Sequence, residues 1–259
     1  MNQSEKRRYL IDELLKENKE YKKISIPDNT NDQKVLLRSL LNVRLPKEIS
    51  NDFINVQDEY LREELKRKGI VEPDSLKEVQ KDLYIWQGDI TLLKVDAIVN
   101  AANSGMTGCY VPCHACIDNC IHTFAGVELR NYCADLMEKQ GHEEGTGLAK
   151  ITPGFNLPAR FVIHTVGPIV EGKLTDKHKE LLKSCYLSCL KIAEDNNVKF
   201  IAFCCISTGV FNFPNDEAAR IAVDTVKEYK NKNNSDIKVI FNVFKDLDLK
   251  IYEDLLCRN

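Results

Sequence analysis

Residues 83–103 read LYIWQGDITLLKVDAIVNAAN, and this stretch decides the fold class. It contains two short apolar segments, at 83–87 and 97–100, and each segment runs into polar residues. Short runs rich in apolar and β-branched residues are typical of strands that helices cover on both faces. The stretch therefore predicts two buried strands of an α/β sheet, with polar side chains in the loops that follow them.

The rest of the chain continues this alternation. We predict further strands at 149–152, 161–165, 200–205 and 238–243, and helices at 117–139, 178–196, 216–229 and 247–256. Alternating elements indicate a layered α/β domain, which we assign to residues 81–259. Ligands of such sheets bind outside the carboxyl ends of the strands, so we expect the functional site there.

The first eighty residues have a different character. They contain no strand-like run, and apolar residues recur with helical spacing at 7–16, 33–41 and 50–68. In the last of these, Phe53, Gln57, Tyr60 and Leu65 fall on one predicted buried stripe. We interpret residues 1–80 as a helical N-terminal extension packed on the main domain.

Composition narrows the class of protein. The net charge of −3 gives no basic footprint, so we expect no nucleic-acid partner. No apolar run is long enough to cross a bilayer, and the N-terminus lacks the apolar core of a secretory signal. We therefore expect no membrane association and a cytoplasmic location. Of the ten cysteines, the four at 185, 189, 204 and 205 lie among apolar residues and are expected to pack in the core.

Three polar groups follow predicted strands. Asp89 can accept a hydrogen bond from an amine or a ribose hydroxyl, or it can cap the next turn. Asn100 and Asn103 offer donors and acceptors that suit sugar hydroxyls, although asparagine also stabilises turns. The loop at 206–211 can direct backbone N–H groups at a phosphate, or serve as an ordinary strand-to-helix turn.

A cysteine-rich segment carries the strongest chemical signal. Residues 108–122 read GCYVPCHACIDNCIH, with four cysteines and two histidines at spacings that suit zinc. A catalytic zinc would use three of these ligands and keep one position open, whereas a closed structural zinc or an iron–sulfur cluster would use four cysteines. Cys113 and Cys116 could instead form a redox pair, or some cysteines could only pack. Composition leaves these alternatives open.

The motifs together resemble the macrodomain family, a module that binds ADP-ribose. They occur in order as GDIT at 88–91, NAAN at 100–103, IDNCIH at 117–122, GTGLA at 145–149, HTVGP at 164–168 and STGVF at 207–211. The resemblance implies a three-layer α/β/α sandwich with a mixed central sheet. The segment GCYVPCHACIDN also resembles the loop of zinc-dependent macrodomains, and this implies Cys109, His114 and Cys116 as ligands of Zn²⁺. Residues 40–46 and 57–60 resemble the helical extension of that subfamily.

The resemblance also implies roles for individual residues. Asp89 and the Ile90 backbone would bind adenine, and Asn103 with Asn100 would bind the distal ribose. The pyrophosphate would lie between the loop at 104–108 and the loop at 207–211, in which Phe211 packs against the ribose. The residues of that second loop are Ser207, Thr208, Gly209, Val210 and Phe211. Asn103 and Asp118 would be catalytic, with Asp118 orienting or deprotonating water, although a first-turn carboxylate can also be structural.

The expected function is zinc-dependent hydrolysis that removes ADP-ribose from mono-ADP-ribosylated protein, with the ADP-ribose ester-linked to Asp or Glu. One alternative is a non-catalytic reader of ADP-ribosylated protein. Another is a hydrolase of a small ADP-ribose metabolite. One departure from the family pattern is Asn212, which stands where many macrodomains have glycine and marks a change in the pyrophosphate loop.

Overall fold

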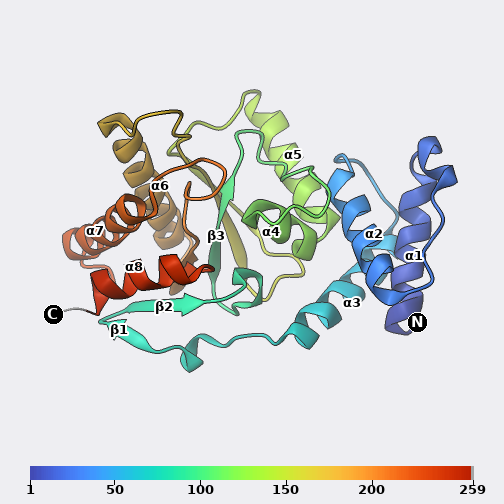
Figure 1. The fold of residues 1–259 in the computed structure, drawn as a ribbon, viewed down its shortest axis with the longest axis horizontal. Helices are drawn as coiled ribbons and strands as arrows, with labels where there is room; N and C mark the ends of the chain where they lie inside the picture. Colours follow the sequence, from blue (N-terminus) through green and yellow to red (C-terminus); the bar gives the residue numbers. More distant parts are fainter. Residues whose placement is uncertain (258–259) are drawn as a thin grey trace.

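A seven-stranded mixed sheet forms the centre of the molecule. The computed structural model describes residues 1–257, and in these residues the strand order is β1-β2-β7-β6-β3-β5-β4 (Figure 1). The five inner strands are parallel, while β1 and β4 pair antiparallel at the two edges. The strands are β1 Glu78–Gln80, β2 Leu83–Gln87, β3 Ala97–Ala102, β4 Ala149–Pro153, β5 Phe161–Val166, β6 Phe200–Phe203 and β7 Lys238–Val243.

Helices cover both faces of this sheet. On one face α4 and α5 pack against β3 and β4, and on the other α6, α7 and α8 form a second layer (Figure 1). Their bounds are α4 Ile117–Ala125, α5 Val127–Gln140, α6 Asp176–Asp195, α7 Asn215–Asn233 and α8 Asp246–Leu256. The predicted α/β/α sandwich with a mixed sheet is therefore confirmed. No helix in residues 1–257 combines the length and apolar character needed to span a bilayer.

Three further helices precede the sheet. They are α1 Gln3–Lys16, α2 Thr30–Val43 and α3 Asn51–Lys68, and they share a hydrophobic cluster that includes Leu10, Leu14 and Leu37. Val127 of α5 belongs to the same cluster, so the three helices pack directly on the α4–α5 side of the sheet (Figure 1). The division into an extension of residues 1–80 and a main domain of residues 81–259 stays a prediction.

One predicted helix is wrong in its extent. The segment 117–139 forms two helices, α4 and α5, because Gly126 between them has φ +97°. A Cβ atom at this position would lie 2.6 Å from Nε2 of Gln57, and Oε1 of Gln57 accepts a hydrogen bond from the Val127 backbone at 2.9 Å. The break is therefore fixed by a side chain of α3 from 70 residues earlier, which local spacing does not reveal. The strand predicted at 200–205 ends at Phe203. The prediction that residues 1–80 contain no strand is also wrong, because β1 at Glu78–Gln80 pairs with β2 at the edge of the sheet.

Candidate active site

The parallel strands bring the predicted site residues to one edge of the sheet. Asp89 follows β2, Asn103 follows β3 and the loop at 207–211 comes shortly after β6. These three strands run in the same direction, so their carboxyl ends meet along that edge. The topology therefore assembles on one side of the molecule groups that are more than a hundred residues apart.

Asp89 caps a turn with one carboxylate oxygen and forms an ion pair with the other. Its Oδ1 accepts hydrogen bonds from the Thr91 backbone at 3.1 Å and from Thr91 Oγ1 at 2.6 Å, which caps a 3₁₀ turn at Ile90–Leu92. Its Oδ2 lies 3.3 Å from Nζ of Lys68, at the end of α3. Ile90 is buried in the core, and the role predicted for its backbone stays a prediction. The two readings of Asp89 are thus compatible.

One exposed aromatic residue at the strand ends, Phe244, is not singled out by the sequence motifs. Phe244 follows β7 and is 76% exposed, and its carbonyl accepts a hydrogen bond from Nε2 of Gln87, the last residue of β2. A single exposed apolar residue is common on protein surfaces, so the interest of Phe244 rests on its position at the carboxyl end of a central strand. The available signal was an aromatic residue directly after a strongly apolar strand, in a fold that binds ligands at strand ends.

The loop at 207–211 is shaped by its own backbone. The Phe213 N–H donates to the Ser207 carbonyl at 3.0 Å, and the Asn212 N–H donates to the Gly209 carbonyl at 3.1 Å. Ser207 and Asn212 both have positive φ, at +65° and +55°. Asparagine tolerates this conformation better than most residues, so Asn212 can adopt the left-handed backbone that glycine favours. Gly209 and Val210 at the tip are exposed, which leaves their backbone open to a ligand.

Asp118 and Asn103 lie together at the end of β3. Asp118 is in the first turn of α4, and its Oδ2 lies 3.4 Å from Nδ2 of Asn103, which also donates to the Gly108 carbonyl at 3.1 Å. Burial raises the pKa of Asp118 to about 6, although the hydrogen bond from Asn100 opposes the shift. A carboxyl group with such a pKa is able to exchange a proton near neutral pH.

Asn100 occupies a different place from the one predicted. Its side chain is fully buried, and its Nδ2 donates to Oδ1 of Asp118 at 2.8 Å and lies 3.1 Å from Nδ1 of His164. The predicted contact with the ribose hydroxyls is therefore corrected, since Asn100 lies beneath Asp118 and orients it. His164 belongs to the same buried network, because its Nε2 also meets the Thr152 hydroxyl at 3.0 Å.

His122 is buried next to this group, and its ring nitrogens have no hydrogen-bond partner in the described residues. Its Nε2 lies 3.6 Å from Oδ1 of Asp118. Burial lowers the pKa of His122 well below its usual value, so the ring is neutral at pH 7. A Cβ atom at Gly108 would meet this ring at 2.7 Å, so the close approach of the loop requires glycine there.

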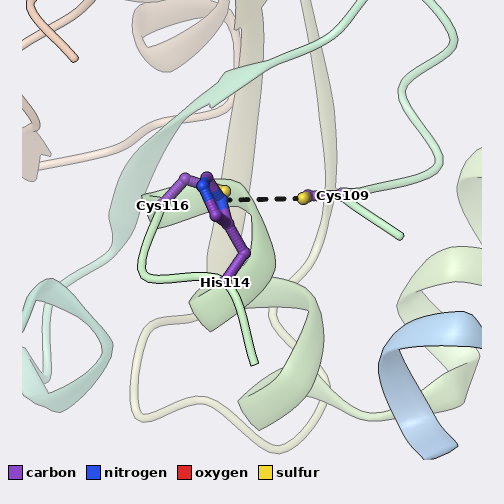
Figure 2. A group of neighbouring side chains, drawn as sticks. All are labelled: Cys109, His114 and Cys116. Atoms are coloured by element: carbon purple, nitrogen blue, oxygen red, sulfur yellow. Dashed lines mark hydrogen bonds between the residues drawn. The ribbon is translucent and has the colours of Figure 1, made fainter. Parts of the chain in front are cut away.

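The three predicted metal ligands lie together. The side chains of Cys109, His114 and Cys116 point toward one another (Figure 2), and their donor atoms all lie within 4.8 Å of one another. Cys109 Sγ is 3.8 Å from Nδ1 of His114. Tetrahedral zinc with bonds of about 2.3 Å to sulfur and about 2.0 Å to nitrogen separates these donors by about 3.6 Å. The two thiols and the imidazole therefore fit a zinc site with one position left for water or substrate.

The other two cysteines of the segment face α2. Cys113 Sγ lies 3.2 Å from the Ser39 hydroxyl, and Cys120 Sγ accepts a contact from Nη2 of Arg38 at 3.5 Å. Neither joins the cluster formed by Cys109, His114 and Cys116. This arrangement disfavours a closed site of four cysteines.

A second group of candidate ligands lies in the core. His122, Cys133 and His164 also bring their donor atoms within 4.8 Å of one another, and all three residues are buried. Both ring nitrogens of His164 already meet Asn100 and Thr152. The imidazole is therefore held by a protein hydrogen-bond network, and the group does not fit a metal site.

Comparison with known proteins places this geometry in a family. The model of the macro domain matches residues 99–222. A protein-ADP-ribose hydrolase from Treponema medium is 58% identical over 260 residues, which is 99% of this chain and 100% of that protein. A solved macrodomain of Oceanobacillus iheyensis with ADP has TM-score 0.62 and 37% identity, over 69% of this chain and 92% of that one. A Trypanosoma brucei macrodomain in complex with ADP-ribose has TM-score 0.66 and 27% identity, over 88% and 96% of the two chains.

The three-layer sandwich with polar strand ends defines an α/β protein whose ligand site is at the carboxyl edge of the sheet. The identity with full-length relatives then makes the family plain. The chain belongs to the macrodomain family, as the sequence motifs predicted.

Proposed function

We propose that this protein is a zinc-dependent hydrolase that removes ADP-ribose from mono-ADP-ribosylated protein, with the ADP-ribose ester-linked to Asp or Glu. The observation that carries this proposal is the position of the three metal-ligand candidates beside Asp118. Cys116 is two residues from Asp118 in the sequence. Burial, with smaller contributions from the neighbouring Cys109 and Asp118, raises the pKa of the Cys116 thiol to about 12. The relatives named protein-ADP-ribose hydrolase over their full length support the same activity.

In this proposal ADP-ribose lies along the carboxyl edge of the sheet. Asp89 and the Ile90 backbone bind the adenine, and the exposed ring of Phe244 stacks on it. The backbone of residues 207–211 holds the pyrophosphate. The macrodomain solved in complex with ADP-ribose supports the choice of this ligand. The distal ribose then reaches Asn103 and Asp118.

The residues of the metal cluster would hold zinc through Cys109, His114 and Cys116. When bound there, zinc would supply an activated water with pKa about 7 or polarise a substrate oxygen. The coordinating thiols must lose their protons, so the high pKa of free Cys116 predicts that metal binding releases protons.

Asp118 and Asn103 supply the remaining chemistry. Asn100 holds Oδ1 of Asp118, which leaves Oδ2 facing Asn103. With a pKa of about 6, the carboxyl group is mostly ionised at pH 7 and can accept a proton from the attacking water. The Asn103 amide can orient a ribose hydroxyl, since it offers both a donor and an acceptor.

A non-catalytic reader is the second candidate, because the residues proposed to bind ADP-ribose could do so without turnover. Such a reader would need neither the metal cluster nor the buried carboxyl group. The test compares acceptor proteins that carry ADP-ribose on Asp or Glu with acceptors that carry it on Ser. We expect zinc-loaded protein to release free ADP-ribose from the first acceptor and not from the second.

Asp118→Asn is the matched variant, because the amide keeps the shape of the side chain and loses its capacity to accept the proton. We expect this variant to bind ADP-ribose and release almost none from the ester-linked acceptor. Absence of release by the unaltered protein would favour the reader. Full release by Asp118→Asn would remove that residue from the catalytic step.

A further inference from the structure

The loop that carries the metal-ligand candidates is held by a residue of the N-terminal helices. Nη2 of Arg38, on α2, donates to the His114 carbonyl at 2.8 Å and to Oδ1 of Asn119 at 2.9 Å. These contacts join residues separated by 76 and 81 positions in the chain. The segment between Cys109 and Cys116 has no helix or strand of its own, so its shape depends on such contacts.

Asn119, which Arg38 contacts, forms hydrogen bonds to the other two candidate ligand residues. Its Nδ2 donates to the carbonyls of Cys109 at 3.3 Å and Val111 at 2.9 Å, and its backbone N–H donates to Sγ of Cys116 at 3.4 Å. A guanidinium can only donate, so Arg38 fixes which end of the Asn119 amide faces it. The amide nitrogen is thereby directed at the loop carbonyls.

We infer that Arg38 is a positioning residue for the cluster Cys109, His114 and Cys116, acting on His114 directly and on Cys109 through the Asn119 amide. The inference deepens the proposed function and rests on it, because it assigns to α2 a part in building the metal site. The N-terminal helices then contribute to the metal site as well as packing on the main domain.

Local strain explains why the loop needs this support. Cys113, in the middle of the loop, has φ +53°, a conformation that costs free energy for a residue with a Cβ atom. The Cys113 N–H donates to Oδ1 of Asn42 at 2.9 Å, one turn along α2 from Arg38. Helix α2 therefore holds the strained residue and the ligand carbonyl from the same side.

Loss of Arg38 is expected to loosen the ligands before it unfolds the domain. The sheet core does not include Arg38, and the other contacts of α2 with α1 and α3 remain. Removing a hydrogen-bond partner that orients metal ligands typically lowers metal affinity about 10- to 100-fold. We expect an effect of this size on zinc and on Co²⁺, which reports ligand geometry through its absorption spectrum.

The experiment titrates Co²⁺ and Zn²⁺ into the reduced full-length chain and into three variants. Arg38→Met keeps an aliphatic stem and removes the donors, and Arg38→Lys keeps one cationic nitrogen that can donate. Lys34→Met is the matched control, since Lys34 is a cation on the same helix that pairs with Glu64 of α3. Thermal unfolding of each apo variant identifies any general loss of structure.

We expect Arg38→Met to weaken metal binding about 10- to 100-fold and to alter the Co²⁺ spectrum. We expect a smaller loss in Arg38→Lys and none in Lys34→Met, with the ADP-ribose Kd unchanged throughout. Wild-type metal affinity and spectrum in Arg38→Met would overturn the inference and leave the proposed function standing. Failure of the unaltered chain to bind either metal would overturn both.

Discussion

The two loops that close the candidate site are built in different ways. The phosphate loop, residues 207–211, is held by backbone hydrogen bonds: the Phe213 N–H donates to the Ser207 carbonyl, and the Val170 N–H donates to the Phe211 carbonyl. The metal loop, residues 108–116, is held by side chains of distant elements, including Arg38 of α2 and Arg130 of α5, which donates to the Cys109 carbonyl at 3.5 Å.

This difference indicates that the two loops serve different parts of the proposed site. In the proposed site the phosphate loop, Asp89 and Phe244 would bind the nucleotide, and the backbone partners of the loop are its neighbours in sequence and Val170. The metal loop needs the N-terminal helices as well. We therefore expect substitutions at the metal site to abolish metal binding without changing ADP-ribose affinity. Substitutions on the nucleotide side should weaken ADP-ribose binding without changing the metal content.

The largest effect is expected from Cys116→Ser. The hydroxyl can still accept the hydrogen bond from the Asn119 N–H that caps α4, whereas the thiolate ligand is lost. We expect bound zinc and release of ADP-ribose to fall to background, while the ADP-ribose Kd stays unchanged. Metal analysis and calorimetry measure the two quantities. Cys257→Ser, which alters an exposed thiol at the end of α8, is the control and should behave as wild type.

A smaller effect, on ADP-ribose binding and not on metal binding, is expected from Asp89→Ala. A hydrogen bond to a charged group contributes about 1.5–3 kcal/mol, so the Kd for ADP-ribose should rise about 10- to 100-fold. Zinc content should not change, since Asp89 lies on the nucleotide side. Asp74→Ala, which removes a carboxylate from another 3₁₀ turn, is the control. Equal affinity of the Asp89 variant would remove this residue from the adenine site.

The smallest effect is expected from Phe244→Ala. Stacking of a ring contributes about 0.5–1.5 kcal/mol, so the Kd for ADP-ribose should rise about 2- to 10-fold. Phe244→Tyr keeps a ring and should retain wild-type affinity. If both variants bind as the unaltered protein does, Phe244 has no part in binding the base.

The sequence predicts the sheet well, because most of its strands are short apolar runs that can be recognised from neighbouring residues alone. The order of motifs also indicates the macrodomain family, and the positions of Cys109, His114 and Cys116 agree with a common cluster. What the sequence does not reveal depends on contacts between distant residues. Gln57 ends α4 at Gly126, Asn100 is buried beneath Asp118, and Arg38 reaches the metal loop. None of these contacts leaves a periodicity or a spacing that local reasoning can detect.

The most direct test of the account removes and restores the metal in a single preparation. The protein is treated with chelator, assayed, and then reloaded with zinc, and ADP-ribose release from an ester-linked acceptor is followed together with the Kd for free ADP-ribose. The account predicts that release is lost with the metal and returns with it, while the Kd stays constant. Release that continues without metal, or a Kd that changes in parallel with release, would contradict it.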